Sequence, residues 1–165
     1  MNAWLTLQQA LAAPGLRLAP VRAGLPSPWS EFARSCFHVK RIPYSLVDAR
    51  DADRGLTSIR TLTGQESSVE GSTRHCEEIV LTFGALRSAG HDYLLGSTLT
   101  ALDLAWAAFA ALIQPLSEGL CPMKPLWREL YTWLPSVTPR HTLEALLSHR
   151  ERTYRDWLTL PVDLG

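Results

Sequence analysis

Hydrophobic and polar positions near the start of the chain follow a strand, helix, strand order. Leu16 to Val21 is a short apolar run bounded by glycines, as a buried strand would be. From Trp29 to Lys40 the apolar residues recur at three- and four-residue spacing, which predicts a helix with one buried face. A second extended run follows from Tyr44 to Val47. The pattern predicts a βαβ unit, preceded by a short amphipathic helix from Thr6 to Ala12.

The rest of the chain has the pattern of helices joined by proline-containing loops. Helical spacing of apolar residues recurs in three segments: Thr73 to Leu86, Leu126 to Tyr131 and Thr142 to Leu158. The first segment is expected to bury one side, made of Cys76, Ile79, Val80, Phe83 and Leu86. Leu104 to Ile113 is apolar nearly all round, which predicts a helix at the centre of a domain. The sequence therefore predicts an α+β, mostly helical fold, with domains at residues 1–69 and 70–165.

Polar residues mark the expected beginnings of two helices. Ser27 precedes Pro28, which suits a first helical turn because proline has no N–H to leave unpaired there. Thr100 and Asp103 have the spacing of a capping box. In that motif the threonine side chain meets the backbone N–H three residues on, and the aspartate reaches back. Ser27 with Pro28, and Thr100 with Asp103, each predict where a helix begins. The capping box predicts nothing about a substrate.

These positions carry a resemblance to glutathione transferases. Ser-Pro-Trp at residues 27–29 and Ile-Pro-Tyr at residues 42–44 are similar to the helix start and following strand of that family's amino-terminal, thioredoxin-like domain. Residues 93–103 resemble the signature before the core helix of its carboxy-terminal domain, with leucine, glycine, threonine and aspartate at matching positions. The resemblance implies a reduced thioredoxin-like βαβ unit in residues 1–69 and an all-α bundle in residues 70–165.

The same resemblance implies a binding site where the helix after the first strand begins. In serine and cysteine classes of the family, the residue before the proline contacts the sulfur of glutathione, which here is Ser27. A helix N-terminus favours a thiolate because its field is positive. We expect Trp29 and Ser30 beside it, and Arg34 one turn later, either as an anion contact or facing solvent. Read from the residues alone, Ser27 is a helix cap.

The resemblance is incomplete after the second strand. A full thioredoxin-like domain continues through a helix to a third strand that begins at a cis-proline, then a fourth strand and a last helix. Leu56 to Thr63 has the pattern of that first helix, but residues 64–75 contain no proline. Loss of the third strand would expose an apolar edge at Leu16 to Val21. We expect cover from the amino-terminal helix, from a second copy in a homodimer, or from Gln65 to Val69.

Two classes of function follow from the resemblance. In the first, the protein is a glutathione transferase-like enzyme in which Ser27 positions the thiol for transfer or addition to a hydrophobic electrophile. In the second, it is a remodelled relative without glutathione dependence that binds, isomerises or cyclises a hydrophobic small molecule in the interdomain cleft. The missing strand favours the second, since each lost charge-assisted contact would weaken glutathione binding by roughly 1.5–3 kcal/mol. The retained Ser27 favours the first.

Composition narrows the expected partners. Among 165 residues, 16 Lys and Arg balance 16 Asp and Glu, so the formal net charge is zero and a nucleic-acid partner is not expected. The basic residues from His149 to Arg155 are interrupted by Glu151, and we interpret them as a solvated helix face. No apolar run approaches the roughly 20 residues that a membrane span needs. We therefore expect no membrane partner.

Cysteine and histidine positions indicate neither disulfides nor a metal site. The three cysteines, Cys36, Cys76 and Cys121, share no CxxC spacing and lie among apolar residues, which predicts reduced core thiols in a cytoplasmic protein. The five histidines are scattered one to a segment, and none has a second ligand at helical spacing. The ligands that the resemblance implies are organic: glutathione and a hydrophobic small molecule.

Overall fold

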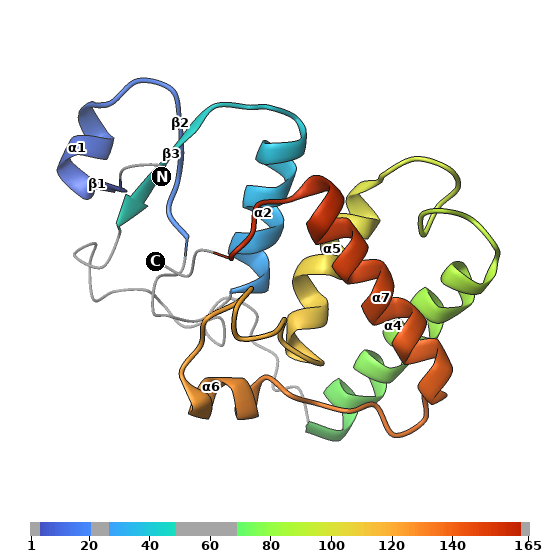
Figure 1. Cartoon of the computed structure of the whole chain (residues 1–165). Coiled ribbons are helices and arrows are strands. Elements are labelled where there is room, and N and C mark those ends of the chain that lie inside the picture. Colours follow the sequence, from blue (N-terminus) through green and yellow to red (C-terminus); the bar gives the residue numbers. More distant parts are fainter. Residues whose placement is uncertain (1–3, 21–26, 49–68, 163–165) are drawn as a thin grey trace.

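The computed structural model describes residues 4–20, 27–48 and 69–162, in which a small parallel sheet lies at one end and helices occupy the rest (Figure 1). The sheet has 3 strands, β1 (Trp4–Thr6), β2 (Leu16–Leu18) and β3 (Tyr44–Asp48), in the order β1-β3-β2. Both outer strands run parallel to β3. The α+β class is confirmed. The likeness to a thioredoxin-like domain stays a prediction.

The predicted strand, helix, strand order is confirmed between β2 and β3. α2 (Pro28–Val39) connects them, and Leu16 of β2 pairs with Tyr44 of β3. The helix begins and ends within a residue of its predicted bounds because Pro28 sets the first turn and Pro43 follows the last. β2 ends at Leu18, whereas the apolar run that predicted it extends three residues further, to Val21.

The amino-terminal segment contributes a strand that the sequence did not predict. β1 pairs with β3, so it extends the sheet on the side away from β2. α1 (Leu7–Ala12) follows, as expected, and Thr6 caps it through a capping box with Gln9. The Gln9 N–H donates to Thr6 Oγ1 at 3.2 Å, and the Thr6 N–H donates to Gln9 Oε1 at 2.9 Å.

Three kinds of cover for the edge of β2 were expected from the sequence. α1 packs mainly against β1 and β3, and Arg17 of β2 donates hydrogen bonds to the Ala10 and Ala13 carbonyls at 2.6 and 2.7 Å. The amino-terminal helix therefore contacts β2 through this one side chain, and cover of the whole edge by the helix stays a prediction. Within the described residues, β2 has a strand partner on one side only. The predicted helix over Leu56 to Thr63 and residues 65–68 lie outside the described residues. Pairing with a second copy stays a prediction.

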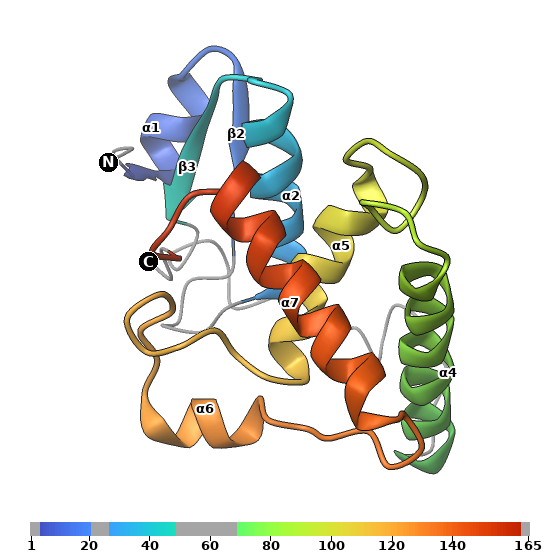
Figure 2. The ribbon, with the colours of Figure 1, turned by 45° about the vertical axis from the view of Figure 1, so that its right-hand side comes forward.

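Helices make up the second half of the chain. They are α4 (Val69–Ser88), α5 (Ala101–Phe109), the short 3-10 helix η1 (Ala110–Leu112), α6 (Pro125–Leu130) and α7 (Arg140–Trp157). α7 begins beside α4 and runs toward α2 (Figure 2). α5 packs against both α2 and α7. The predicted central helix is confirmed, because Leu104, Trp106 and Ala110 are buried. α5 therefore joins the βαβ unit to the helical half.

α4 buries a narrower face than the sequence predicted. Val80 is buried, and Phe83 and Leu86 pack against the same cluster, as expected. Cys76 and Ile79 are exposed, so their placement on the buried side is wrong. The reason is that α4 packs mainly on one neighbour, α7, which covers a single stripe of its surface.

Gly84 allows the close approach of α4 and α7. A methyl group in place of its hydrogen would lie 2.3 Å from Thr142 Cγ2, well inside van der Waals contact. The residue is buried and helical, so glycine is required here by space and not by backbone conformation. The absence of a side chain at Gly84 therefore allows α4 and α7 to pack closely at this crossing.

Candidate functional site

The first turn of α2 has the geometry that the sequence predicted. Ser27 is the N-cap, and its Oγ accepts a hydrogen bond from the Ser30 N–H at 3.4 Å. Its backbone carbonyl accepts the first helical hydrogen bond, from the Glu31 N–H at 2.9 Å. Pro28 occupies the first helical position. Ser27 is therefore a helix cap, and any further role must use what capping leaves available.

Capping leaves the hydroxyl hydrogen of Ser27 available. A serine hydroxyl both accepts and donates, and the cap uses it as an acceptor. Among the described residues, none accepts a hydrogen bond from Ser27 Oγ. The hydroxyl also lies at the positive end of a helix of 12 residues. An anion placed there would meet a free O–H donor and a favourable helix field.

Trp29 presents an aromatic surface beside this turn. Its side chain is 71% exposed although its ring meets the Phe109 ring edge to face, with centroids 4.6 Å apart and planes at 86°. Phe109 ends α5, so the contact ties the start of α2 to the helical half. The remaining indole surface faces outward. It offers an apolar wall to a ligand held near Ser27.

The structure brings Ser27, Trp29 and Ser30 together but places Arg34 elsewhere. The Arg34 guanidinium lies 3.8 Å from the Glu31 carboxylate, one turn closer to the start of the helix. Arg34 lines a polar groove between α2, Tyr44 and the carboxy-terminal tail, with a volume of about 40 Å³. Ser27 and Trp29 do not line this groove. An anion at Arg34 would therefore occupy a different site from a thiol at Ser27.

A second, smaller cavity lies between α2, α5 and α7. Its volume is about 10 Å³, and its walls include Pro28, Ala107, Arg150 and Tyr154. Such a volume holds about one water molecule. Neither a tripeptide nor a hydrophobic metabolite fits inside it. A ligand of that size at Ser27 and Trp29 would therefore lie outside this cavity.

The interpretation of the carboxy-terminal helix as a solvated basic face is wrong for its inner side. His149 and Arg150 are each 2% exposed, and Tyr154 is buried. Their positions continue the spacing of Leu143 and Leu146, so polar residues occupy the same buried stripe. The helical spacing alone indicated that these positions are buried, but their polar side chains led to the opposite prediction. Buried polar groups require partners. His149 has Asp103, and Arg150 Nη1 donates to the Gln114 carbonyl, while Arg150 Nε has no hydrogen-bond partner among the described residues.

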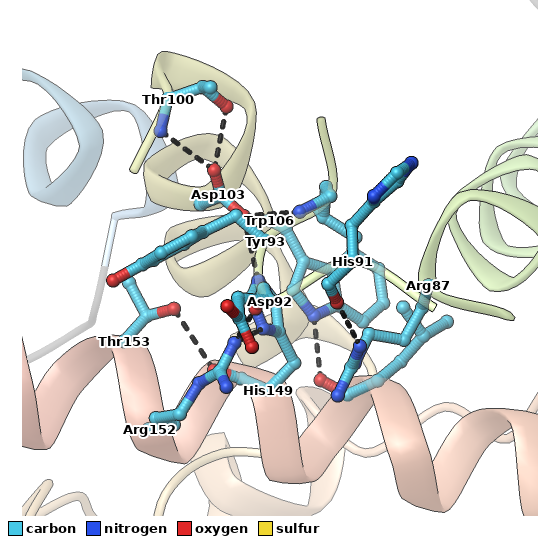
Figure 3. A network of polar contacts seen from close by, with 12 residues as sticks. Arg87, His91, Asp92, Tyr93, Thr100, Asp103, Trp106, His149, Arg152 and Thr153 are labelled. Atoms are coloured by element: carbon cyan, nitrogen blue, oxygen red, sulfur yellow. Dashed lines mark hydrogen bonds and ion pairs between the residues drawn. The ribbon is translucent and has the colours of Figure 1, made fainter. Parts of the chain in front are cut away.

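The capping box at α5 lies within this buried network (Figure 3). Asp103 Oδ2 accepts hydrogen bonds from the N–H and Oγ1 of Thr100, at 2.8 and 2.6 Å. Asp103 Oδ1 accepts from the Leu94 N–H at 2.9 Å and lies 2.8 Å from His149 Nε2. Burial alone would raise the pKa of Asp103, but these hydrogen bonds outweigh it and lower the pKa to about 2.

The neighbours of His149 determine which ring nitrogen carries a proton. Arg152 Nη2 lies 3.1 Å from His149 Nδ1, and a guanidinium can only donate, so Nδ1 is the acceptor. The proton is therefore on Nε2 and points at Asp103 (Figure 3). Arg152 also donates to the Asp92 carbonyl and lies over the Tyr93 ring, 5.3 Å from its centroid. The Asp103 and His149 side chains are both 0% exposed, so this pair joins helices and contacts no ligand.

The cysteines differ in their surroundings. Cys121 is buried, Cys36 is half-buried and Cys76 is exposed, and all three are free thiols. The prediction of three core thiols is thus wrong for Cys76, which lies on the outer side of α4. The Cys121 carbonyl accepts a hydrogen bond from Arg128 Nη2 at 2.7 Å. Arg128 also donates to the Leu116 carbonyl, so it holds this loop closed.

In the described part of the chain, no group of three or more histidine, cysteine, aspartate or glutamate side chains could hold a metal ion. In the same residues, every helix is too short or too polar to cross a membrane.

Comparisons with family models, with curated proteins and with solved structures found no match to this chain.

Proposed function

We propose that this protein is a glutathione transferase-like, thiol-binding enzyme whose site is the first turn of α2. Ser27 donates a hydrogen bond to the sulfur of glutathione as a thiolate, and Trp29 contacts a hydrophobic electrophile. One observation supports the proposal above the others: the cap uses Ser27 Oγ as an acceptor, and its hydrogen has no acceptor among the described residues.

The electrostatics of the turn favour the reactive form of the thiol. A thiolate is the nucleophile, and it forms when the sulfur proton passes to solvent. The helix field and the Ser27 O–H both stabilise the negative sulfur, which lowers the pKa of the bound thiol. Attack then forms a carbon–sulfur bond. The electrophile either loses a leaving group with its electron pair or, in an addition, takes a proton from water.

A second candidate function has an observation of its own. The indole of Trp29 is 71% exposed beside Phe109, which suits binding of an apolar ligand whether or not a thiol is present. In this alternative the protein binds, isomerises or cyclises a hydrophobic small molecule without glutathione. Removal of Trp29 would weaken ligand binding, and removal of the Ser27 hydroxyl would not.

Calorimetric titration with glutathione separates these functions when three variants are compared. Ser27→Ala removes both the cap and the donor, whereas Ser27→Asp keeps a good cap but cannot donate and repels a thiolate. Ser27→Thr keeps both properties. We expect saturable binding in the wild type and in Ser27→Thr, and none in the other two. Ser27→Asp that binds as tightly as the wild type would rule out a sulfur contact at Ser27.

The control for folding is thermal unfolding of the same variants. Ser27→Ala is expected to lose about 1 kcal/mol of stability because the cap is lost, and Ser27→Asp close to none. If even the wild type gives no heat at millimolar glutathione, the second candidate is tested with the apolar dye ANS. Dye fluorescence that falls in Trp29→Ala but not in Ser27→Ala would then support glutathione-independent binding.

A further inference from the structure

Large aliphatic side chains are exposed along α6 and the loop that follows it. Leu126, Leu130, Leu134 and Val137 are each more than half exposed, at 61%, 63%, 67% and 56%. Leu126 and Leu130 lie four residues apart in α6, so they share one face of that helix. Single exposed apolar residues are normal on a protein surface, whereas a run of them indicates a contact surface. These four residues are called the α6 edge.

The α6 edge belongs to a segment at the margin of the molecule. In Figure 1 and Figure 2, α6, the loop that joins it to α7 and the beginning of α4 run along the lower margin, while the sheet lies at the upper end. The segment keeps this place when the view turns. A flat surface can therefore approach it without first meeting the sheet or α2.

Polar groups of this segment form hydrogen bonds within the protein. The Ser136 N–H and Oγ both donate to Glu77 Oε1 of α4, at 3.0 and 2.5 Å. Thr132 Oγ1 donates to the Arg128 carbonyl at 2.8 Å. No N–H needs a partner at three further positions, which are Pro125, Pro135 and Pro139. These groups would keep their partners in an apolar medium, where an unpaired polar group is costly.

Charges of both signs occur along the segment. Arg128 lies 2.8 Å from the Glu118 carboxylate, and Arg140 lies 2.8 Å from that of Glu144. Two further exposed charges are of opposite sign, those of Lys124 and Glu129. A partner for the α6 edge is therefore selected by apolar contact and not by one sign of charge.

The apolar area of the α6 edge is small for a contact between two proteins. A fully exposed aliphatic side chain offers roughly 100 Å² of apolar surface, so four that are a little over half exposed offer roughly 250 Å². A stable complex buries about 800 Å² on each partner. A lipid leaflet requires no matching surface, because it deforms around each side chain that enters it, and binding grows with the apolar area buried. The size of the edge therefore favours lipid over a second copy.

We propose that the α6 edge is a membrane-contact surface, whose four aliphatic side chains enter the headgroup and upper acyl region of one phospholipid leaflet. Three half-buried aromatic residues lie between them in the sequence, Trp127, Tyr131 and Trp133. Tryptophan and tyrosine are enriched at that depth. The expectation of no membrane partner rested on the lack of a spanning run, and contact with one leaflet needs none. The contact does not involve Ser27, so it stands apart from the proposed function.

The test is sedimentation of the full chain with phosphatidylcholine vesicles. We expect the wild type to sediment with them at low and at high salt, because apolar contact is not screened. Lipids brominated in the acyl chain should quench its tryptophan emission. Failure of the wild type to sediment would overturn the proposal. Binding that needs added phosphatidylserine and disappears at high salt would contradict it as well, because charge would then hold the protein.

A double variant locates the contact. Leu130→Gln with Leu134→Gln removes two of the four aliphatic side chains and should weaken vesicle binding by about tenfold or more. Leu11→Gln is the matched control, because Leu11 is 70% exposed on α1, beside the sheet, and should bind as the wild type does. Both substitutions are at exposed positions, so melting temperatures should stay close to that of the wild type. Equal binding by the double variant and the wild type would exclude the α6 edge as the contact.

Sedimentation velocity distinguishes a second copy from lipid. The wild type is expected to have the same mass in solution as the double variant. A dimer of the wild type that the double variant cannot form would mean that the α6 edge binds another copy of the chain, and the lipid proposal would fail.

Discussion

His149 Nε2 lies 2.8 Å from Asp103 Oδ1, and both side chains are completely buried. The aspartate thus serves two purposes at once. It reaches back to Thr100 to begin α5, and it holds α7 against that helix through His149. A motif that is normally local in a helix is here also a contact between two helices distant in sequence.

Removal of this carboxylate should destabilise the whole fold. Asp103→Ala leaves the His149 N–H and the Leu94 N–H without their acceptor, and each buried donor left unpaired costs about 1–3 kcal/mol. The measurement is urea unfolding followed by tryptophan fluorescence. Asp156→Ala is the control, since this exposed aspartate bonds only to its neighbour Arg155, and its effect should be within about 0.5 kcal/mol. Equal effects of the two variants would contradict the role given to Asp103.

The same carboxylate predicts how stability depends on acid. Its pKa is lowered from 3.8 when unfolded to about 2 when folded, because the hydrogen bonds outweigh burial. A lowered folded-state pKa means that this stabilisation is fully present above pH 3.8 and is lost as the pH falls toward 2. The loss should amount to roughly 2 kcal/mol. The free energies of unfolding of the wild type and of Asp103→Asn should be compared between pH 5 and pH 2, and the two values should converge at pH 2. If the difference between them stays constant over this range, the lowered pKa of Asp103 does not cause the loss of stability in acid.

Gly84→Ala should separate α4 from α7. The added methyl would lie 2.3 Å from Thr142 Cγ2, and overpacking of this kind typically costs about 1–3 kcal/mol. Thr142→Ser removes the clashing methyl, and the next atom, Thr142 Cβ, is 3.9 Å away. The double variant Gly84→Ala with Thr142→Ser should therefore regain most of the lost melting temperature. Failure of the serine to rescue would mean that the crossing is wider than described.

The three thiols should react with an alkylating reagent in order of their exposure. Cys76 is exposed and should react first, and Cys36 should follow slowly because partial burial raises the pKa of its thiol. Burial raises the pKa of Cys121 to about 11, so this thiol should react only in denaturant. Mass spectrometry of peptides after timed alkylation reads the order. Early labelling of Cys121 in the native protein would contradict the packing of its loop.

The sequence was informative where one residue dictates local geometry. Ser27 with Pro28, and Thr100 with Asp103, predicted the beginnings of α2 and α5, because caps satisfy backbone groups within one helical turn. The site at Ser27 could be placed for the same reason. The binding role given to Ser27 comes from the resemblance and not from this local geometry, so it stays a prediction.

The sequence was uninformative where partners lie far away along the chain. β1 has 3 residues, too few for alternation to show, and its partner β3 lies some forty residues later. His149 and Arg150 are buried because α7 lies between other elements, and their polarity predicted the opposite. The cavity beside Arg150 needs three helices to form, and no spacing within any one of them reveals it.

The order of the sheet constrains the synthesis of this protein. Both outer strands precede the central strand in the chain, and among the described residues each pairs with that strand alone. Until β3 has been synthesised, β1 and β2 lack the one strand with which they pair in the described residues, and α2 has no complete sheet to pack on. The whole amino-terminal unit can therefore close only when Tyr44 to Asp48 leaves the exit tunnel, in a single late step.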